Sequence, residues 1–484
     1  MNELSTLDAT AQAELVRRRD VTPVELVEAA ISRIDALNPT LNAVVTPTFD
    51  QAIDAAQAPA HGPFRGVPFL LKDLACEMDG VRFTEGSRFL ADNVSSFDSE
   101  LVVRLRAAGL VILGKTNTPE FGMAPACEPE LFGPTRNPWD TNRSTSGSSG
   151  GAAAAVASGM VPFAHGNDLG GSLRYPASAC GLFALKPTRA RNPLGPEYGD
   201  VAAGGAVEHA LTRSVRDSAA LLDATSGPDV GDPYWAPPPA RPFAAEVGAD
   251  PGRLRIAFTA RTPDGDLGHA DCVAAVEHAA RLCESLGHEV FEAEWPGFTP
   301  DVGAAIGTII QGATAWILAY WIRHVGREPG PDEIEPLTRA LWEAGQRVSA
   351  ADWLLAIEST QRFTRRVAHA FGSFDLFLTP TMSTPPLPIG TMRSTPDDPW
   401  RSLETSGASV RYAGVVANLT GNPAMSVPLW WNDENMPIGA HFLAPFGDEA
   451  TLFRLAAQLE AAQPWADRLP AVHASRVGAS AAGR

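Results

Sequence analysis

A lysine ends an apolar run early in the chain, where Gly66–Asp73 reads GVPFLLKD. A free lysine has a pKa of about 10.4 and is charged at neutral pH. Burial lowers that pKa, because the ammonium form loses its hydration, and a neutral amine can serve as a general base. Lys72 is therefore a candidate base. The competing interpretation, which is the commoner one for an isolated lysine at a strand end, is a side chain that reaches solvent.

A second segment, Ser146–Gly151, contains only serine and glycine and leads directly into the alanine run Ala152–Ala155. Small residues permit tight turns and unusual dihedral angles. A flexible linker is the alternative, but linkers seldom continue straight into an alanine-rich helix. The segment also fits G-x-S-x-G, the nucleophile elbow of α/β-hydrolases. That motif requires a preceding strand, whereas residues 140–145 are typical of a loop.

A third segment, Gly166–Ala177, follows an apolar run and contains Asp168-Leu169-Gly170-Gly171-Ser172. Such a sequence can direct successive backbone N–H groups to one concave side, where they would stabilise an oxyanion. Ser172, at the end of that run, is a candidate nucleophile. An anion-binding site with a serine ligand explains this segment equally well when it is considered alone.

Taken together, the three segments resemble the amidase signature family, whose catalytic set is Ser–Ser–Lys. The resemblance extends from about residue 8 to 470. Lys72 matches the family's lysine, and Ser148 matches its bridging serine, which lies on a cis peptide. Ser172 follows Ser148 by 24 residues and matches the nucleophile. Three C-terminal segments also look like the family: Asn418–Pro428, Met436–Gly439 and Leu459–Trp465.

The resemblance implies a relay in which neutral Lys72 accepts a proton from Ser148, and Ser148 accepts one from Ser172. Ser172 then attacks the acyl carbon. The implied oxyanion donors are the backbone N–H groups of Leu169, Gly170 and Gly171. Ser149 and Asp168 are expected to lie behind the catalytic residues and to hold them in position. Arg174 could pair with Asp168 or with a substrate carboxylate, and we favour the structural pairing.

Asn167 and Asn137–Trp139 look most like the branch that includes the 6-aminohexanoate cyclic-dimer hydrolases, and urethane-cleaving hydrolases belong to the wider family. The expected substrates are therefore small-molecule amides, extending to carbamates, esters and cyclic or oligomeric 6-aminohexanoate amides. The chain departs from the family at three positions: Asn167 where Thr is frequent, Leu169 where Thr or Ile is frequent, and Ser146 where Gly or Pro is common. None of these departures removes a catalytic group.

Two further residues are candidates for the substrate pocket. Cys127 could edge the active site, although a buried inert thiol is the commoner case. Trp316 could line an acyl pocket on a helix, and a plain core position explains it equally well. A histidine-based mechanism is not favoured, because His165 is close to Ser172 in sequence but sits at a strand end, and His441 is expected to be structural.

Elements that must position these residues can be predicted from periodicity and from turn residues. Strand and helix signals alternate, which predicts an α/β fold with a mixed, twisted, multi-stranded sheet covered by helices on both faces. The expected strands are Val67–Leu71, Leu110–Leu113, Val161–Ala164, Leu182–Leu185, Leu254–Phe258, Phe374–Leu378 and Ala424–Pro428. The expected helices are one starting at Thr22–Glu25 and stopping at Asn38–Pro39, then Ser99–Ala108, Ala152–Ser158, His269–Leu286, most of 300–366, and Glu449–Ala462.

The predicted organisation is a single catalytic domain over residues 1–470, within which 192–366 forms a variable cap. The proline-rich stretch Pro228–Pro242 should be a linker or a surface excursion, and 471–484 a flexible tail. No cofactor and no metal are implied, since the five cysteines form no CxxC pair. The expected partners are a small-molecule amide or carbamate substrate and a second copy of the chain in a homodimer.

The net charge of −18 would repel phosphate backbones, so nucleic-acid binding is not expected. The N-terminal residues show no basic segment followed by an apolar run, and the apolar stretch Ala304–Trp321 is expected to be a buried helix rather than a membrane span. The prediction is a cytoplasmic enzyme without membrane contact. Two alternatives stay open: a glutaminase subunit of a tRNA-dependent amidotransferase, and a catalytically silent protein of the same fold.

Overall fold

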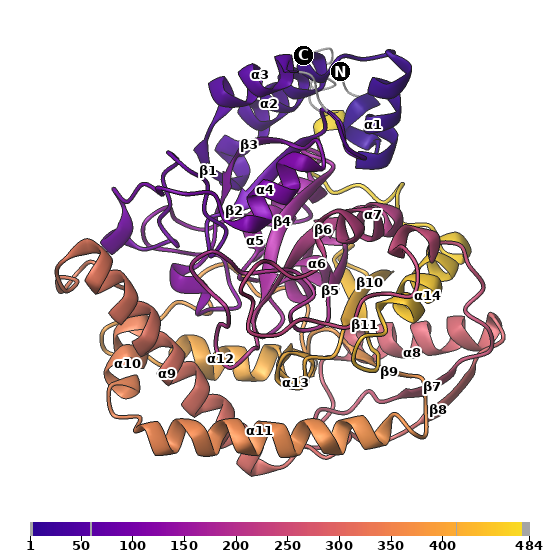
Figure 1. Ribbon diagram of the computed structural model, residues 1–484. Coiled ribbons are helices and arrows are strands. Elements are labelled where there is room, and N and C mark those ends of the chain that lie inside the picture. The colour runs from indigo at the N-terminus through magenta and orange to yellow at the C-terminus, as the bar shows by residue number, and fades with distance from the viewer. Residues whose placement is uncertain (1–2, 59–60, 413, 477–484) are drawn as a thin grey trace.

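The structure is a computed structural model that describes residues 3–58, 61–412 and 414–476 (Figure 1). Its strands form a three-stranded sheet, in the order β1-β3-β2, and an eight-stranded sheet, in the order β4-β6-β5-β10-β11-β9-β7-β8. The strands are β1 (Val44–Pro47), β2 (Pro68–Lys72), β3 (Val111–Thr116), β4 (Phe163–Asp168), β5 (Phe183–Lys186), β6 (Val207–Thr212), β7 (Arg255–Phe258), β8 (Glu289–Glu292), β9 (Leu376–Pro380), β10 (Ala424–Trp431) and β11 (Pro437–Leu443). Parallel and antiparallel pairs both occur, so the predicted mixed sheet is confirmed.

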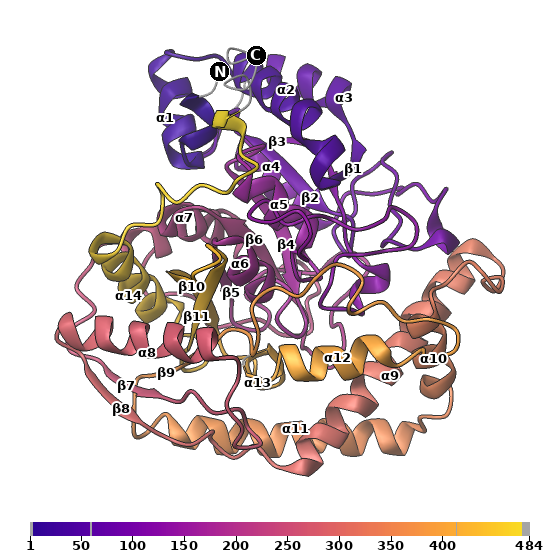
Figure 2. The ribbon, with the colours of Figure 1, turned by 180° about the vertical axis from the view of Figure 1, so that it is seen from behind.

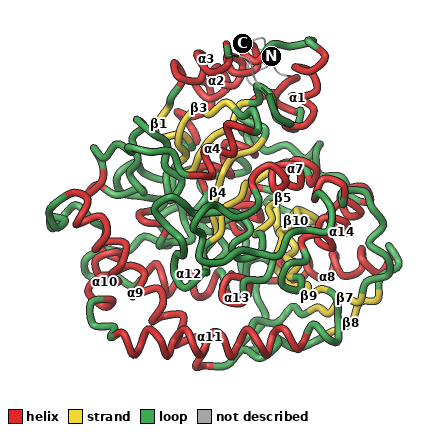
Figure 3. The backbone as a smooth tube through the Cα atoms, viewed as in Figure 1, coloured by secondary structure: helices red, strands yellow, loops and turns green. Residues whose placement is uncertain are grey.

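Helices cover the sheets and build a separate layer beyond them (Figures 1 and 2). The helices are α1 (Ala9–Arg18), α2 (Pro23–Leu41), α3 (Phe49–Gln57), α4 (Glu100–Ala107), α5 (Gly150–Ala157), α6 (Arg174–Cys180), α7 (Val215–Thr225), α8 (Ala270–Ser285), α9 (Pro300–Val325), α10 (Pro336–Gly345), α11 (Ala350–Ala370), α12 (Arg401–Ser409), α13 (Gly414–Thr420) and α14 (Glu449–Ala462). Every strand predicted from an apolar run is present, with bounds shifted by one or a few residues. Between the sheets and the outer helices, much of the centre consists of loops (Figure 3).

Side chains of β2 show why both faces of the sheet are covered. Leu70 packs into one cluster with residues of α2, α3 and α5. Its neighbours Phe69 and Leu71 point to the opposite face and join a cluster with α4 and Phe163. The side chains of Phe69, Leu70 and Leu71 are all fully buried. This alternation is that of a strand with two covered faces, which explains why the run reads as continuously apolar in the sequence.

Helix α2 does not stop at Asn38–Pro39, as expected, but continues to Leu41. Pro39 lies in the last turn, where the loss of one N–H donor interrupts little of the helix. Asn42 ends the helix in the left-handed conformation, with φ 52°. The predicted start is confirmed, because Thr22 and Glu25 form a reciprocal capping box.

The cap is narrower than the expected range 192–366. Within that range, β6 is an interior strand of the eight-stranded sheet, between β4 and β5, and β7 and β8 lie at the other end of that sheet. Helices α7 and α8 pack on these strands. What lies beyond the sheet is the layer of α9, α10 and α11 at the lower side of Figure 1, with the loop 193–206 between it and the sheet. The sequence VEHALT of β6 is too polar to reveal a fully buried strand.

Helix α9 also differs from the expected buried helix. It is long and apolar enough to cross a membrane by length and composition, but only 33% of its most apolar window is buried. Its buried positions, such as Ile309 and Leu318, face the rest of the protein. Of the expected tail, residues 471–476 pack against the protein, since Val472 donates to the Pro138 carbonyl and Ala474 to that of Ser158. Residues 477–484 lie outside the described residues.

Candidate active site

Lys72 is the last residue of β2, and its side chain is fully buried. Its Nζ lies 2.6 Å from Ser148 Oγ and 2.6 Å from Asn167 Oδ1. Burial lowers the pKa of Lys72 to about 7, although the carboxylates of Glu208 and Asp168 oppose that shift. A neutral amine can donate an N–H to Asn167 and turn its lone pair toward the Ser148 hydroxyl. The predicted buried lysine is thus present, and the solvent-reaching alternative is excluded.

Ser148 belongs to the predicted Gly/Ser run, which forms the turn into α5. The Gly147–Ser148 peptide bond is cis, as the resemblance implied. The glycines that follow are required by close packing. A Cβ on Gly150 would collide with Cys127, and one on Gly151 would collide with the backbone of Asn117. The run is therefore a tightly packed turn and not a flexible linker.

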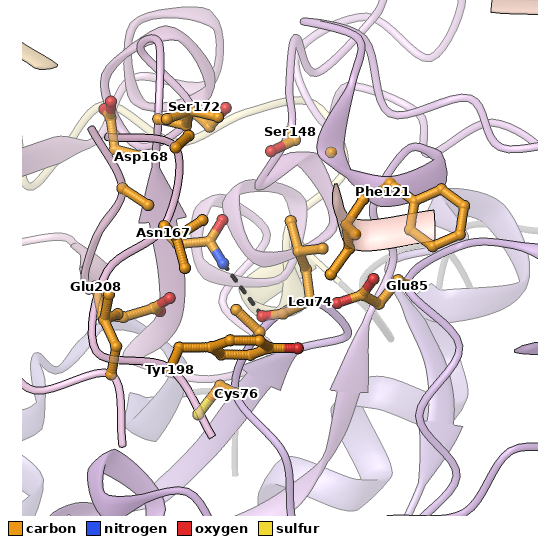
Figure 4. Close-up of a pocket in the computed structure, with 18 of the residues that line it drawn as sticks. Leu74, Cys76, Glu85, Phe121, Ser148, Asn167, Asp168, Ser172, Tyr198 and Glu208 are labelled. Carbon is orange, nitrogen blue, oxygen red and sulfur yellow. Dashed lines mark hydrogen bonds between the residues drawn. The ribbon is translucent and has the colours of Figure 1, made fainter. Parts of the chain in front are cut away.

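Ser172 follows β4 and lines the same cavity as Ser148. The two loops are tied together, because the Ser149 N–H donates to the Ser172 carbonyl at 3.2 Å. Among the described residues, no hydrogen bond joins the two hydroxyls, but both lie at the same side of the cavity (Figure 4). Hydrogen bonds of catalytic groups are often long in the absence of substrate.

Asp168, at the end of β4, organises the loop that carries Ser172. Its carboxylate accepts hydrogen bonds from the N–H groups of Gly171, at 2.7 Å, and Leu173, at 3.1 Å. It also pairs with Arg174 at 2.9 Å, and both side chains are fully buried. Burial alone would raise the pKa of Asp168, but the Arg174 guanidinium overrides this and holds it well below its usual range. Arg174 further contacts Asn418, at 2.7 Å. This geometry agrees with the structural pairing that we favoured for Arg174.

The hydrogen bond from Gly171 to Asp168 bears on the expected oxyanion donors. In this structure that N–H is directed to a carboxylate, which is a strong acceptor, and not toward the cavity. Leu169 and Gly170 remain as candidates, and Leu169 lines the cavity. Gly171 itself cannot carry a side chain, because its φ is 120° and a Cβ would overlap the ring of Tyr175.

The cavity around the two serines is walled mainly by apolar side chains. It encloses about 930 Å³, including its opening to solvent. The apolar wall consists of Leu74, Leu101, Phe121, Met123, Leu194, Val201, Ala313, Trp316 and Ile317. Trp316 thus lies where the sequence placed it as a pocket residue.

Cys127, in contrast, does not line the cavity. Its thiol is fully buried beside the first turn of α5, where it contacts Thr135 Oγ1 at 3.4 Å. Burial raises the pKa of the Cys127 thiol to about 12. The expectation that it edges the active site is therefore corrected, because Cys127 is fully buried and is not among the residues that line the cavity, and the inert thiol is the interpretation that holds.

Four polar residues at the site were not singled out as site residues from the sequence. Asn167 holds Lys72, and its Nδ2 donates to the Leu74 carbonyl at 3.1 Å. Glu85, Tyr198 and Glu208 line the cavity. Asn167 was recognisable as a polar residue next to Asp168. The other three come from two loops and a strand whose positions the sequence does not reveal.

The histidines near the site are engaged elsewhere. His165 Nδ1 accepts the backbone N–H of Lys72 at 3.1 Å, so its other nitrogen carries the proton and faces Glu208. His441 accepts from Arg174 at 3.0 Å, and burial lowers its pKa well below the usual value. Neither is bonded to Ser172 among the described residues. In that same part of the chain, no group of three or more His, Cys, Asp or Glu side chains is arranged to hold a metal ion.

The comparison with known proteins decides what kind of enzyme this geometry belongs to. The Amidase family profile matches residues 25–453. The chain belongs to the amidase family. It is 39% identical over 479 residues to the 6-aminohexanoate-cyclic-dimer hydrolase of Paenarthrobacter ureafaciens, with 96% of each chain covered. The family and these named amide hydrolases make the protein a hydrolase that acts on carbon–nitrogen bonds other than peptide bonds.

Solved structures agree with this assignment. A 6-aminohexanoate cyclic dimer hydrolase complexed with substrate superimposes on this amidase with a TM-score of 0.91 at 37% identity, and the match covers 97% of this chain and 99% of the other. A bacterial aryl acylamidase of the amidase signature family matches with a TM-score of 0.84 at 26% identity, covering 96% and 97%. The predicted fold and family are thereby confirmed.

Proposed function

We propose that this amidase cleaves small-molecule amides through an acyl-enzyme on Ser172. The observation that carries the proposal is the contact between the fully buried Lys72 amine and Ser148, on the wall of a cavity that also presents Ser172. An amine with a pKa lowered to about 7 has a substantial neutral fraction at neutral pH. Such a base is matched to proton transfer near that pH.

In this mechanism, the Ser172 proton passes to Ser148 Oγ while the Ser148 proton passes to Lys72 Nζ. The Ser172 oxygen forms a bond to the acyl carbon. The backbone N–H groups of Leu169 and Gly170 are proposed to hold the resulting oxyanion, and one such donor typically contributes about 3 kcal/mol. The carbon–nitrogen bond then breaks as Ser148 gives a proton to the leaving nitrogen and regains one from Lys72. Water hydrolyses the ester on Ser172.

The predominantly apolar cavity supports substrates with alkyl or aryl groups. We propose small-molecule amides, including cyclic or oligomeric amides of 6-aminohexanoate, as the substrate class, with carbamates and esters as further candidates. A glutaminase role in an amidotransferase is the alternative from sequence. Glutamine carries a charged amino-acid group, which the mainly apolar wall does not favour.

The test is product release by liquid chromatography and mass spectrometry from four compounds: glutamine, an aryl anilide, an aryl carbamate and the cyclic bis-amide of 6-aminohexanoate. We expect release from the anilide or the cyclic bis-amide, and none after Ser172→Ala. Turnover of glutamine alone would contradict the proposal and favour the amidotransferase alternative. Full activity of Ser172→Ala would remove Ser172 as the nucleophile.

The proposed setting is a cytoplasmic enzyme that works as a homodimer. Helix α9 packs against α10 and α11, and its buried positions serve the protein core, which supports a role in a soluble protein. The exposed side chains of Leu354 and Leu355 on α11, 63% and 59% accessible, offer an apolar surface to a second copy. Light scattering of the purified protein tests the dimer, and a monomer at micromolar concentration would contradict it.

A further inference from the structure

Glu208 is a close neighbour of the side chain that holds the proposed base. It lies on β6, which pairs antiparallel with β4, and in that register Glu208 is directly opposite Asn167. Side chains directly opposite each other in such a pair share one face of the sheet, with their Cβ atoms about 4.5–5.5 Å apart. Figure 4 shows both side chains at the same side of the pocket. Since Asn167 Oδ1 lies 2.6 Å from Lys72 Nζ, the carboxylate and the amine are neighbours of the same amide group.

His165 connects the same two residues by a second route. Its Nδ1 accepts the backbone N–H of Lys72 at 3.1 Å, so the proton of the ring is on Nε2, which donates to Glu208 Oε2 at 2.5 Å. The imidazole is therefore neutral and adds no charge that would balance the carboxylate. The Cys76 thiol also lies on this part of the cavity wall, and burial raises its pKa to about 12, so it is neutral as well. Both His165 and Glu208 are buried, at 1% and 4% accessible.

The other acidic groups around the amine are either paired or uncharged at neutral pH. They are Asp168, Glu85 and Cys127. Asp168 is paired with the guanidinium of Arg174. Burial raises the pKa of Glu85 to about 8 and that of Cys127 to about 12, so both groups are largely protonated at pH 7. Of these acidic groups, Glu208 is the one that places an anion near the amine without a cation of its own.

We propose that Glu208 is a positioning residue for the reaction, whose carboxylate makes the buried Lys72 amine a stronger base than burial alone would leave. An opposite charge close to an amine favours its protonated form. Burial lowers the pKa of Lys72, and Glu208 is the strongest of the charges that oppose this shift. A general base is most effective when its pKa lies near the operating pH. The inference rests on the proposed function, because it takes Lys72 as the base.

A purely structural carboxylate is the competing interpretation, in which Glu208 serves only to orient His165. Glu208→Gln separates the two, because the glutamine Oε1 can still accept from His165 Nε2 while the charge is lost. If the role is structural, the basicity of Lys72 should not change in this variant. If the charge acts on the amine, the basicity should fall.

The lysine content of the chain permits a direct measurement of that basicity. The chain contains three lysines, Lys72, Lys115 and Lys186. Enzyme labelled with carbon-13 at the lysine Cε atoms therefore gives three lysine signals, and the Lys72 signal is the one that is missing from Lys72→Met. Its titration by nuclear magnetic resonance reports the pKa of Lys72 without substrate or turnover.

Glu208→Gln should move the midpoint of the Lys72 titration to lower pH by about one pH unit or more, because the opposite charge is lost. Glu85→Gln is the matched control, since it makes the same change at a cavity carboxyl that is already largely protonated, and it should leave the midpoint unchanged. Glu208→Met, which has a similar volume and no charge, is a second variant if circular dichroism shows that Glu208→Gln does not fold. An unchanged midpoint in a folded Glu208 variant would overturn the inference, and so would an equal shift in Glu85→Gln.

The pH dependence of kcat/KM is measured on the same variants with a compound that the wild type cleaves. If Lys72 is the base, the rise of kcat/KM with pH should move with the titration midpoint in Glu208→Gln. The limiting rate at high pH should fall several-fold, because a weaker base accepts the proton less readily. A shifted titration without the same shift in kcat/KM would support the role of Glu208 and contradict Lys72 as the base of the proposed function. A shift in neither would overturn the inference and leave the proposed function standing.

Discussion

Two regions of the amidase meet at the cavity and are built in different ways. The reaction loops, defined here as Gly147–Gly151 and Asp168–Arg174 together with Lys72, consist largely of buried groups held by short hydrogen bonds and charge pairs. The cap, α9 to α11, contributes only Ala313, Trp316 and Ile317 to the cavity, all apolar. The reaction loops position the groups that transfer protons and form the acyl bond. The cap is expected to determine which substrate binds.

The two regions also differ in what holds them. Asp168 and Arg174 are fully buried, so each depends on the other for its charge to be compensated. The cap is held by an apolar cluster, in which Leu318 and Trp321 pack with Phe83, and by polar contacts such as Trp321 to Glu85 and the Glu335 N–H to the Glu120 carboxylate at 2.7 Å. We therefore expect substitutions in the reaction loops to abolish the reaction or destabilise the fold, and substitutions in the cap to change selectivity.

The largest effect is expected from Ser172→Ala. Removal of the nucleophile should lower kcat about ten-thousandfold or more. The melting temperature should stay unchanged, because the Ser172 hydroxyl makes no hydrogen bond among the described residues. Ser158→Ala, just beyond α5 and outside the reaction loops, is the control, and it removes only a buried hydroxyl that donates to the Ala155 carbonyl at 3.3 Å. A comparable loss in both variants would place the chemistry elsewhere.

Lys72→Met should lower kcat about a thousandfold, as expected for the loss of a positioned base. In the wild type, kcat/KM should rise with pH through about 7, because Lys72 becomes neutral there. A pH-rate profile from pH 5 to 9 measures this. A flat profile over that range would contradict the role of Lys72 as the base.

The same lysine makes a prediction for stability. Its pKa falls from 10.5 in the unfolded chain to about 7 in the folded protein. Between these values the unfolded chain binds the proton that the folded protein lacks, so folding becomes more favourable as pH rises. The free energy of unfolding of the wild type, relative to Lys72→Met, should therefore increase from about pH 7 to about pH 10 and be constant below. Urea unfolding of both proteins measures the difference.

Asp168→Asn should destabilise the protein by about 3–5 kcal/mol, because it leaves Arg174 charged and buried without its partner. Chemical denaturation measures the loss. Glu358→Gln is the matched control, since it breaks an exposed pair with Arg362 on α11. Its effect should stay within about 0.5 kcal/mol. Equal losses in the free energy of unfolding for the two substitutions would contradict the proposed difference between the reaction loops and the cap.

The smallest effect is expected in the cap. Trp316→Ala should lower kcat/KM for a bulky aryl anilide about tenfold relative to a small aliphatic amide, since an aromatic wall contact is lost. Leu354→Ala, on the exposed side of α11, should change neither value. A uniform loss for both substrates after Trp316→Ala would mean that this cap residue supports the reaction itself and not the choice of substrate.

The sequence predicted the catalytic residues and the strands, because the chemistry of the site and the burial of the strands both restrict which residues can occur there. Ser148 and Ser172 stand in segments rich in glycine and serine, and Lys72 ends an apolar run. The three segments together predicted the site, and the structure brings Lys72 and Ser148 into contact. The apolar runs predicted the strands because each packs on both faces. The paired burial of Asp168 and Arg174 also agrees with the expected structural role.

The sequence was uninformative where position depends on tertiary packing. Glu208 lies on a strand whose polar sequence conceals its burial, and Glu85 and Tyr198 lie in loops. The range assigned to the cap was too wide for the same reason. Cys127 was misplaced because proximity in sequence to the Gly/Ser run does not show on which side of that turn a side chain lies.

The most direct test of the account is the site of covalent labelling. The enzyme would be treated with an aryl phosphonate directed at serine nucleophiles, digested, and mapped by tandem mass spectrometry. The account predicts one adduct, on Ser172, which forms more slowly in Lys72→Met and is absent in Ser172→Ala. An adduct on Ser148, or labelling that persists in Ser172→Ala, would contradict the assignment of Ser172 as the nucleophile.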